Sequence, residues 1–144
     1  MTTETDKTPA RIVNPGNPVP RGIDDFAEAR TRGCCLVDKS RLIGDVLACD
    51  DKIVLITRPR RFGKTINQSM LRYFLETPPE GTNTRALFDG LLVSEDAATM
   101  EHQGGYPVIS LTLKSAKLPT WERAYNELCR LIHEEIHRHP QALE

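Results

Sequence analysis

The segment KIVLITRPRRFGKTINQSMLRYF, residues 52–74, decides the fold predicted for this chain. Its first part, residues 53–57, is apolar and β-branched, and is short enough for a strand that is buried on both faces. From residue 66 onward the apolar residues recur at helical spacing, which predicts a helix. The basic loop RPRRFGKT, residues 58–65, lies between the two. A strand, a loop ending in GKT and a helix are the context that a phosphate-binding loop requires.

Three consecutive residues carry the predicted chemistry of this loop. A helix that begins near Lys64 directs unpaired backbone N–H groups and partial positive charge toward an anion. Gly63 lets the backbone approach phosphate without a Cβ atom in between. The Lys64 ammonium is predicted to reach the terminal phosphates, and the Thr65 hydroxyl is predicted to bind Mg²⁺. The expected ligands are therefore ATP, or another nucleoside triphosphate, and Mg²⁺.

The loop departs from the general pattern GxxxxGK[ST] at its first position, where Arg58 stands in place of glycine. Pro59 biases Arg58 toward extended conformations and removes one N–H donor. The amides of the remaining loop are then expected to hold phosphate, helped by arginine side chains, which bind phosphate oxygens in pairs. The predicted nucleotide-binding residues are Arg60, Arg61, Phe62, Gly63, Lys64 and Thr65. The alternative is a chance GKT within a solvated basic loop.

The composition describes one domain without a strong charge. The chain has 144 residues, 39% of them hydrophobic, and a formal net charge of −1, which gives no global argument for nucleic acid or an anionic membrane. It contains no apolar run of about 18 residues and begins with a polar, acidic segment, so no membrane span or secretory signal is predicted. The four cysteines show no CxxC spacing, which favours free thiols. A cytoplasmic location is the resulting expectation.

The sequence also predicts the structure of the segments on either side of the loop. Residues 1–20 contain little apolar content and are predicted to form a disordered arm. Residues 106–113, YPVISLTL, form a second apolar and β-branched run, which predicts a buried strand parallel to the one at about residues 52–57. Short helices are expected around both strands, with Asp38 as the N-cap of one of them. The last helix is expected to start at Thr120 and to carry a continuous apolar stripe.

The last helix also contains His133-Glu134-Glu135-Ile136-His137, which satisfies the zinc motif HExxH. Both histidines are expected on the flank of the apolar stripe, and few residues follow that could supply a third ligand. Histidines near the C-terminal end of a solvated helix are the simpler interpretation, because they interact favourably with the helix dipole. A zinc site at residues 133–137 is kept as a remote alternative.

The order of these pieces resembles that of the predicted AAA-ATPase-like family. The resemblance runs from about Val19 to the end of the chain and is carried by GIDDF (22–26), LVDKSRLIGDVL (36–47), ITRPRRFGKTINQSMLRYF (56–74), LFDGL (87–91) and YPVISLTLKS (106–115). Members are P-loop proteins, and the longer ones often carry a PD-(D/E)XK nuclease-like domain downstream. Arg58 in place of the first glycine is this family's own version of the loop.

The resemblance implies roles for several residues. Lys64 and Thr65 would bind phosphate and Mg²⁺, and Arg60 and Arg61 would line the loop. Asp38 and Lys39 match a family motif to which the sequence assigns no role. Taken as residues alone, they are a helix cap and a solvated charge.

The predicted fold class is α/β, a partial three-layer P-loop NTPase fold with a short parallel sheet flanked by helices. Hydrolysis by such enzymes requires an acidic residue at the end of a later apolar strand, and residues 106–113 run instead into Lys114-Ser115. The family places that strand, and the nuclease-like domain, beyond the end of this sequence. Residues 21–144 are therefore expected to be the N-terminal portion of a P-loop domain, incomplete at its C-terminus, with weak or absent turnover. The missing part or an oligomer partner would cover its open sheet edge.

A second function class stays open at this point. The basic loop could belong to a non-enzymatic module that binds nucleic acid or a protein, with salt-sensitive affinity for phosphate backbones. Phe62 is the one aromatic residue among the arginines, so the loop offers little stacking surface for bases.

Overall fold

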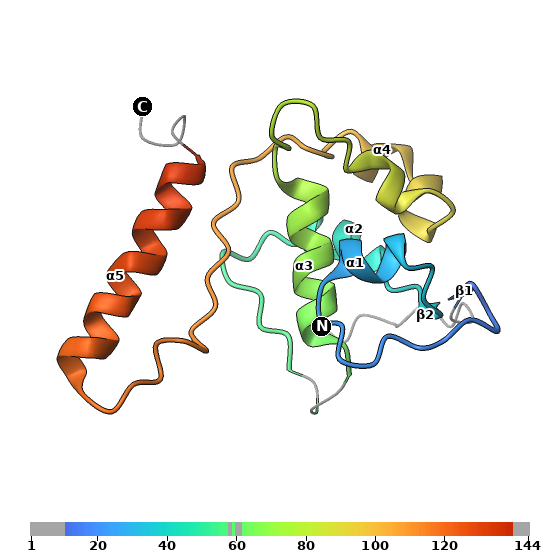
Figure 1. The fold of residues 1–144 in the computed structure, drawn as a ribbon. Helices are drawn as coiled ribbons and strands as arrows, with labels where there is room; N and C mark the ends of the chain where they lie inside the picture. Colours follow the sequence, from blue (N-terminus) through green and yellow to red (C-terminus); the bar gives the residue numbers. More distant parts are fainter. Residues whose placement is uncertain (1–10, 58, 60–61, 140–144) are drawn as a thin grey trace.

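A computed structural model describes residues 11–57, 59 and 62–139 of the chain. Short helices dominate it, and a small two-stranded sheet lies at one side (Figure 1). The elements in chain order are β1 (Ile12–Val13), α1 (Phe26–Thr31), β2 (Leu36–Val37), α2 (Arg41–Leu47), α3 (Lys64–Leu75), the 3-10 helices η1 (Arg85–Phe88) and η2 (Leu92–Glu95), α4 (Ala97–Met100) and α5 (Trp121–Arg138).

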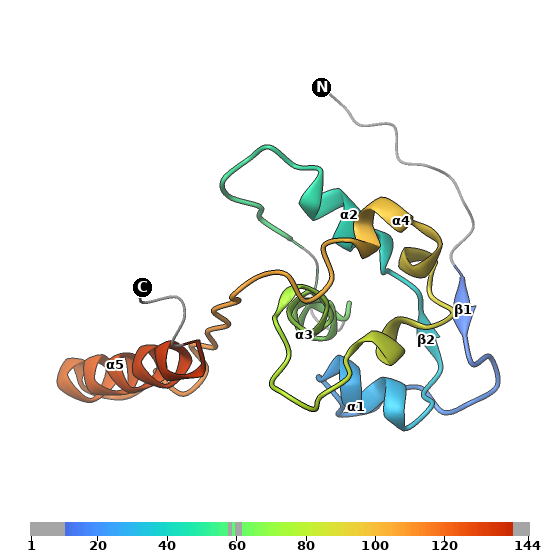
Figure 2. The ribbon, with the colours of Figure 1, turned by 90° about the horizontal axis from the view of Figure 1, so that it is seen from above.

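The core forms around three phenylalanines from separate elements. Phe26 of α1 stacks on Phe88 of η1 with ring centroids 5.3 Å apart, and Phe74 of α3 meets Phe88 edge-on at 5.1 Å. Ile43 and Met70 are buried in the same cluster. In Figure 2, α3 is seen almost end-on, with α1 on one side of it and α2 and α4 on the other. This central packing fixes the direction of α3 and therefore the position of the loop that precedes it.

The sheet differs from the predicted one. β1 and β2 pair antiparallel, with Ile12 opposite Val37 and Val13 opposite Leu36. Within the part of the chain that the structure describes, the one parallel pairing is an isolated bridge between Glu76 and Tyr106. The chain is thus α/β in its elements, but the described residues contain no parallel P-loop sheet and no three-layer arrangement.

The predicted strands at residues 52–57 and 106–113 are not strands in the structure. Both segments lack regular strand pairing, apart from the bridge at Tyr106, and their apolar side chains are exposed: Ile53 is 85% and Leu55 is 83% accessible. A parallel strand needs a ladder partner and covered faces. The predicted burial of these apolar runs is therefore wrong as well, because among the described residues neither segment has a neighbouring strand that would cover it.

Part of the expected N-terminal arm is ordered against the rest of the molecule. Residues 1–10 lie outside the described residues, whereas Ile12–Val13 form β1 within the range assigned to the arm. The Arg11 guanidinium pairs with Glu95 at 2.7 Å, and the Arg11 carbonyl accepts a hydrogen bond from the Asp38 N–H at 2.8 Å. The described part of this segment therefore covers the core beside β2 and η2.

Helix α5 begins as predicted, but most of its apolar stripe is left uncovered. Thr120 is its N-cap and accepts a hydrogen bond from the Arg123 N–H at 3.4 Å. Figures 1 and 2 show α5 standing apart from the other helices, joined to them by an extended segment. Its apolar stripe is largely exposed, with Trp121 75% and Tyr125 52% accessible. No helix in the described ranges is both long and apolar enough to cross a membrane.

Polar contacts attach the C-terminal end of α5 to the rest of the chain. The buried carboxylate of Glu76 lies 3.1 Å from Nε2 of His139 and also pairs with Arg138. The same His139 nitrogen is 2.8 Å from the carbonyl oxygen of Val108. Glu135 accepts a hydrogen bond from the Ser110 N–H at 3.0 Å. These contacts attach the C-terminal end of α5 to Glu76, at the end of α3, and to residues 108–110 of the extended segment.

Candidate functional site at the start of helix α3

The loop before α3 ends in a left-handed glycine, Gly63. Gly63 is the N-cap residue, with φ 74° and ψ 24°, a conformation that favours glycine. Its carbonyl accepts the Asn67 N–H at 2.9 Å, so the first helical turn closes directly after it. No side chain caps this helix start. The N–H groups of its first turn and the positive end of the helix dipole are therefore directed at the space before the helix.

The predicted loop residues have the exposure that a binding site needs. Phe62 is 56% accessible, and Lys64 and Thr65 are also exposed. The Lys64 ammonium donates a hydrogen bond to the Pro59 carbonyl at 2.9 Å, which folds the side chain back over the loop. Arg60 and Arg61 lie outside the described residues, as does Arg58.

A second lysine reaches the loop from a distant part of the sequence. Lys39, between β2 and α2, donates a hydrogen bond from Nζ to the Phe62 carbonyl at 3.0 Å. Its Nζ is 3.9 Å from the point at which a Cβ atom on Gly63 would lie. The sequence offered a signal for this residue, the Asp38-Lys39 motif, but not the contact itself.

Asp38 has a role that differs from the predicted helix cap. The N-cap of α2 is Ser40, and α2 begins at Arg41. The carboxylate of Asp38 accepts hydrogen bonds from the N–H groups of Ser40, at 2.8 Å, and Leu92, at 2.7 Å. Asp38 thus joins the segment before α2 to η2, because each carboxylate oxygen is committed to a different backbone donor.

An open pocket lies in front of the loop. It has a volume of about 1050 Å³ and is lined by residues 62–65, by Lys39 and by residues 20–24. This volume is just above the range of about 300–1,000 Å³ that small-molecule sites span. Arg21, Lys39 and Lys64 bring positive charge to its lining, and the Asp24 carboxylate is paired with Lys114 at 3.4 Å. The pocket is large enough for a nucleotide and its lining favours an anion.

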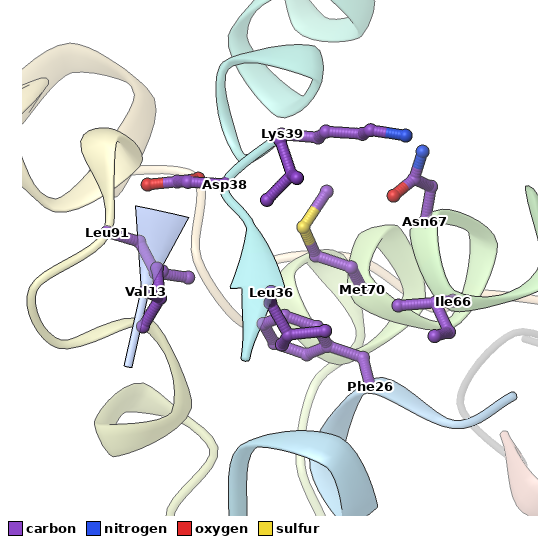
Figure 3. A pocket seen from close by; sticks show the side chains of 10 residues that line it. Val13, Phe26, Leu36, Asp38, Lys39, Ile66, Asn67, Met70 and Leu91 are labelled. Carbon is purple, nitrogen blue, oxygen red and sulfur yellow. The ribbon is translucent and has the colours of Figure 1, made fainter. Parts of the chain in front are cut away.

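A second, much smaller cavity lies beside the open pocket. Figure 3 shows it between β2 and α3, with Phe26 and Met70 among its apolar walls and the Lys39 side chain extending above it toward Asn67. Its volume is about 30 Å³. Lys39 and Asn67 line both spaces, so the inner cavity is an apolar extension behind the candidate site.

The HExxH motif does not assemble a metal site within residues 11–57, 59 and 62–139. No group of three or more His, Cys, Asp or Glu side chains comes together there in a way that could hold a metal ion. The rings of His133 and His137 have centroids 4.0 Å apart, and Nδ1 of His137 is 2.9 Å from the His133 carbonyl oxygen. Glu134 pairs with Arg130. The described residues therefore give no support to the zinc alternative, because they bring no third ligand to the two histidines.

Fold and site together define a small α/β protein in which a glycine-started helix faces an open, positively lined pocket. Residues 20–143 match the family model described as predicted AAA-ATPase. The chain belongs to this AAA-ATPase-like family, which confirms the resemblance drawn from its motifs. No match is found among curated proteins, and none among solved structures.

Proposed function

We propose that this protein binds ATP together with Mg²⁺ in the pocket before α3. The Gly63 backbone and the N–H groups of the first turn of α3 would hold the phosphates, with Arg60 and Arg61 lining the loop. Lys64 would exchange its hydrogen bond to the Pro59 carbonyl for one to a terminal phosphate. Thr65, on the first turn of α3, would place its hydroxyl on a Mg²⁺ ion that keeps several waters.

The observation that carries the proposal is the left-handed Gly63 at the uncapped start of α3. A twelve-residue helix whose first turn faces an open pocket without a side-chain cap presents backbone donors to a ligand rather than to the protein itself. The neighbouring Lys39 and Lys64 add cations, and membership of a family described as predicted AAA-ATPase points to a nucleoside triphosphate.

We propose that hydrolysis by this chain is weak or absent. A water-activating or metal-binding carboxylate is expected at the end of an apolar strand beside the loop. The second apolar segment, residues 106–113, is followed by Lys114 and Ser115 and does not pair beside the loop. Asp24 lines the pocket, but its carboxylate is engaged by Lys114.

A thermal-shift experiment tests nucleotide binding. Millimolar ATP with Mg²⁺ is expected to raise the Tm of the wild-type protein, because a ligand that binds only the folded state stabilises it. Lys64→Ala should abolish the shift and keep the Tm of the unliganded protein, since Lys64 is exposed. Lys117→Ala, which removes an exposed lysine outside the pocket, is the matched control and should keep the shift. No shift in the wild type at millimolar ATP would contradict the proposal.

The exposed apolar segments support a further part of this proposal. Residues 53–57 and 106–113 keep strand-forming composition while showing accessible apolar side chains. We propose that additional strands pair with them in the functional ATPase, supplied by a longer form of the chain or by an oligomer partner. Size-exclusion chromatography with light scattering should then show association of the present chain that increases with concentration. A clean monomer at high concentration would count against it.

A further inference from the structure

Asp38 and Ser40 fix the short segment that carries Lys39. Both are buried, with Ser40 fully inaccessible. The Asp38 carboxylate accepts hydrogen bonds from the N–H groups of Ser40 and Leu92, and the Ser40 hydroxyl accepts one from the Val93 N–H at 2.9 Å. The residues on either side of Lys39 are thus tied into the core through η2. This leaves the backbone of Lys39 little freedom to move.

The Lys39 side chain, in contrast, points out of the core and into the pocket. The side chain is exposed and lines the open pocket. It donates its hydrogen bond to the carbonyl of Phe62, and Phe62 directly precedes Gly63. Figure 3 shows it fully extended above α3. Within the described part of the chain, Lys39 forms no ion pair with a carboxylate. Its positive charge is therefore available at the loop, held by a neutral carbonyl that an anion can replace.

We infer that Lys39 is a second phosphate-binding cation of this site. The inference rests on the proposed function, because it concerns the same ligand. When the phosphates enter, Lys39 transfers its hydrogen bond from the Phe62 carbonyl to a phosphate oxygen, approaching from the side of β2 and α2, whereas Lys64 approaches from α3. Asp38 and Ser40 act as positioning residues that hold the Lys39 backbone at the correct distance.

Charge explains why the phosphate is the better partner. The hydrogen bond between the Lys39 ammonium and the exposed Phe62 carbonyl has one charged partner and competes with water, whereas a phosphate oxygen adds an opposite charge and therefore a Coulomb attraction. Lysine is a common point-charge ligand for phosphate. The side chain needs no large movement, since its Nζ already lies close to Gly63.

Equilibrium dialysis with Mg-ATP and with inorganic tripolyphosphate tests the inference. Lys39→Met is expected to lower the affinity for both ligands by the same factor, about tenfold or more, because the lost contact is to phosphate. Lys39→Arg should recover most of the affinity, since arginine also binds phosphate. Lys117→Met removes the same charge outside the pocket and should bind as the wild type does. Urea unfolding of Lys39→Met and Lys117→Met should show equal stability, which separates binding from folding.

The outcomes distinguish the two proposals. If Lys39→Met binds Mg-ATP as tightly as the wild-type protein or more tightly, Lys39 only stabilises the loop without ligand. The inference is then wrong, while the proposed function stands. If Lys39→Met loses affinity for Mg-ATP but not for tripolyphosphate, Lys39 contacts another part of the nucleotide and the inference is again overturned. If the wild type binds neither ligand, the proposed function fails and the inference fails with it.

Discussion

The carboxylate of Asp38 accepts a hydrogen bond of 2.7 Å from the backbone N–H of Leu92, a residue 54 positions further along the chain. This bond connects the segment before α2 to η2 and lies next to the lysine that contacts the loop. Because of this bond, the short segment between β2 and α2 can hold the Lys39 side chain at the candidate site.

Asp38→Asn is expected to destabilise the protein by about 1–3 kcal/mol, because a buried backbone donor loses its acceptor. An amide has one oxygen, so it can accept from Ser40 or from Leu92 but cannot replace both carboxylate contacts. Urea denaturation followed by circular dichroism measures the change. The matched control is Asp89→Asn at an exposed aspartate, which should leave stability unchanged. Equal midpoints for the two variants would show that the Asp38 contacts do not stabilise the fold.

Gly63→Ala is expected to lose nucleotide binding beyond its effect on stability. Both Gly63 and Gly90 have positive φ, 74° and 73°, so alanine at either position should cost about 1–2 kcal/mol of backbone strain. A Cβ atom at residue 90 meets nothing within 4 Å, and residue 90 is outside the pocket. Gly90→Ala should therefore show the same loss of stability with unchanged Mg-ATP affinity. If Gly63→Ala binds Mg-ATP as Gly90→Ala does, the backbone of residue 63 has no part in the site.

Glu76→Gln is expected to release the C-terminal end of α5. The buried Glu76 carboxylate meets Arg72 at 2.9 Å, His139 at 3.1 Å and Arg138. Both arginine side chains are about one third exposed, which limits the expected cost to about 1–2 kcal/mol of local stability. Hydrogen exchange should become faster in the last turns of α5 while α3 stays protected.

The control for this variant is Glu80→Gln, which changes the same group at an exposed position. It should leave exchange in α5 unchanged. Equal exchange rates in both variants would mean that Glu76 does not attach α5.

Helix α5 should lose stability in acid. The Arg130 guanidinium, with help from the Ser115 hydroxyl, lowers the pKa of Glu127 to about 2. Burial by itself would raise the pKa of Glu135, but the Ser110 N–H and Arg138 outweigh it and lower that pKa as well. A carboxylate with a lowered pKa in the folded state stabilises that state above its unfolded pKa, and this contribution disappears as the pH falls.

This loss of stability is therefore expected as the pH falls from about 5 toward 2. Far-UV circular dichroism across this range, together with hydrogen exchange in α5, measures it. Glu127→Gln should reduce the pH dependence, because the variant has no carboxylate to protonate at this position. A helical signal from α5 that stays constant down to pH 2.5 would contradict the assignment.

The sequence predicted those parts of the fold that depend on neighbouring residues. The apolar spacing after Thr65 became α3, and Thr120 became the N-cap of α5, because both signals act within a few residues of the chain. The strands at 52–57 and 106–113 could not be predicted in the same way. An apolar run indicates that a segment is suited to burial, but strand pairing depends on which other segment lies beside it.

The candidate site likewise combines residues that a local motif predicted with one that only the fold brings there. Phe62, Gly63, Lys64 and Thr65 are adjacent in sequence, so the GKT motif predicted them as a unit, and the structure places them at one pocket. Lys39 contacts the loop from 23 residues away, so its approach follows from the hydrogen bonds that tie Asp38 and Ser40 to η2 rather than from any local pattern. Arg60 and Arg61, also predicted for the site, lie outside the described residues.

Isothermal titration calorimetry of the wild-type protein with Mg-ATP tests the central claim most directly. One binding event per chain is predicted for the wild type, and a loss of affinity of at least about tenfold is predicted for Lys64→Ala, whose ammonium would otherwise contact phosphate. No measurable binding by the folded wild-type protein at millimolar Mg-ATP, or equal binding by Lys64→Ala, would contradict a nucleotide site at the start of α3.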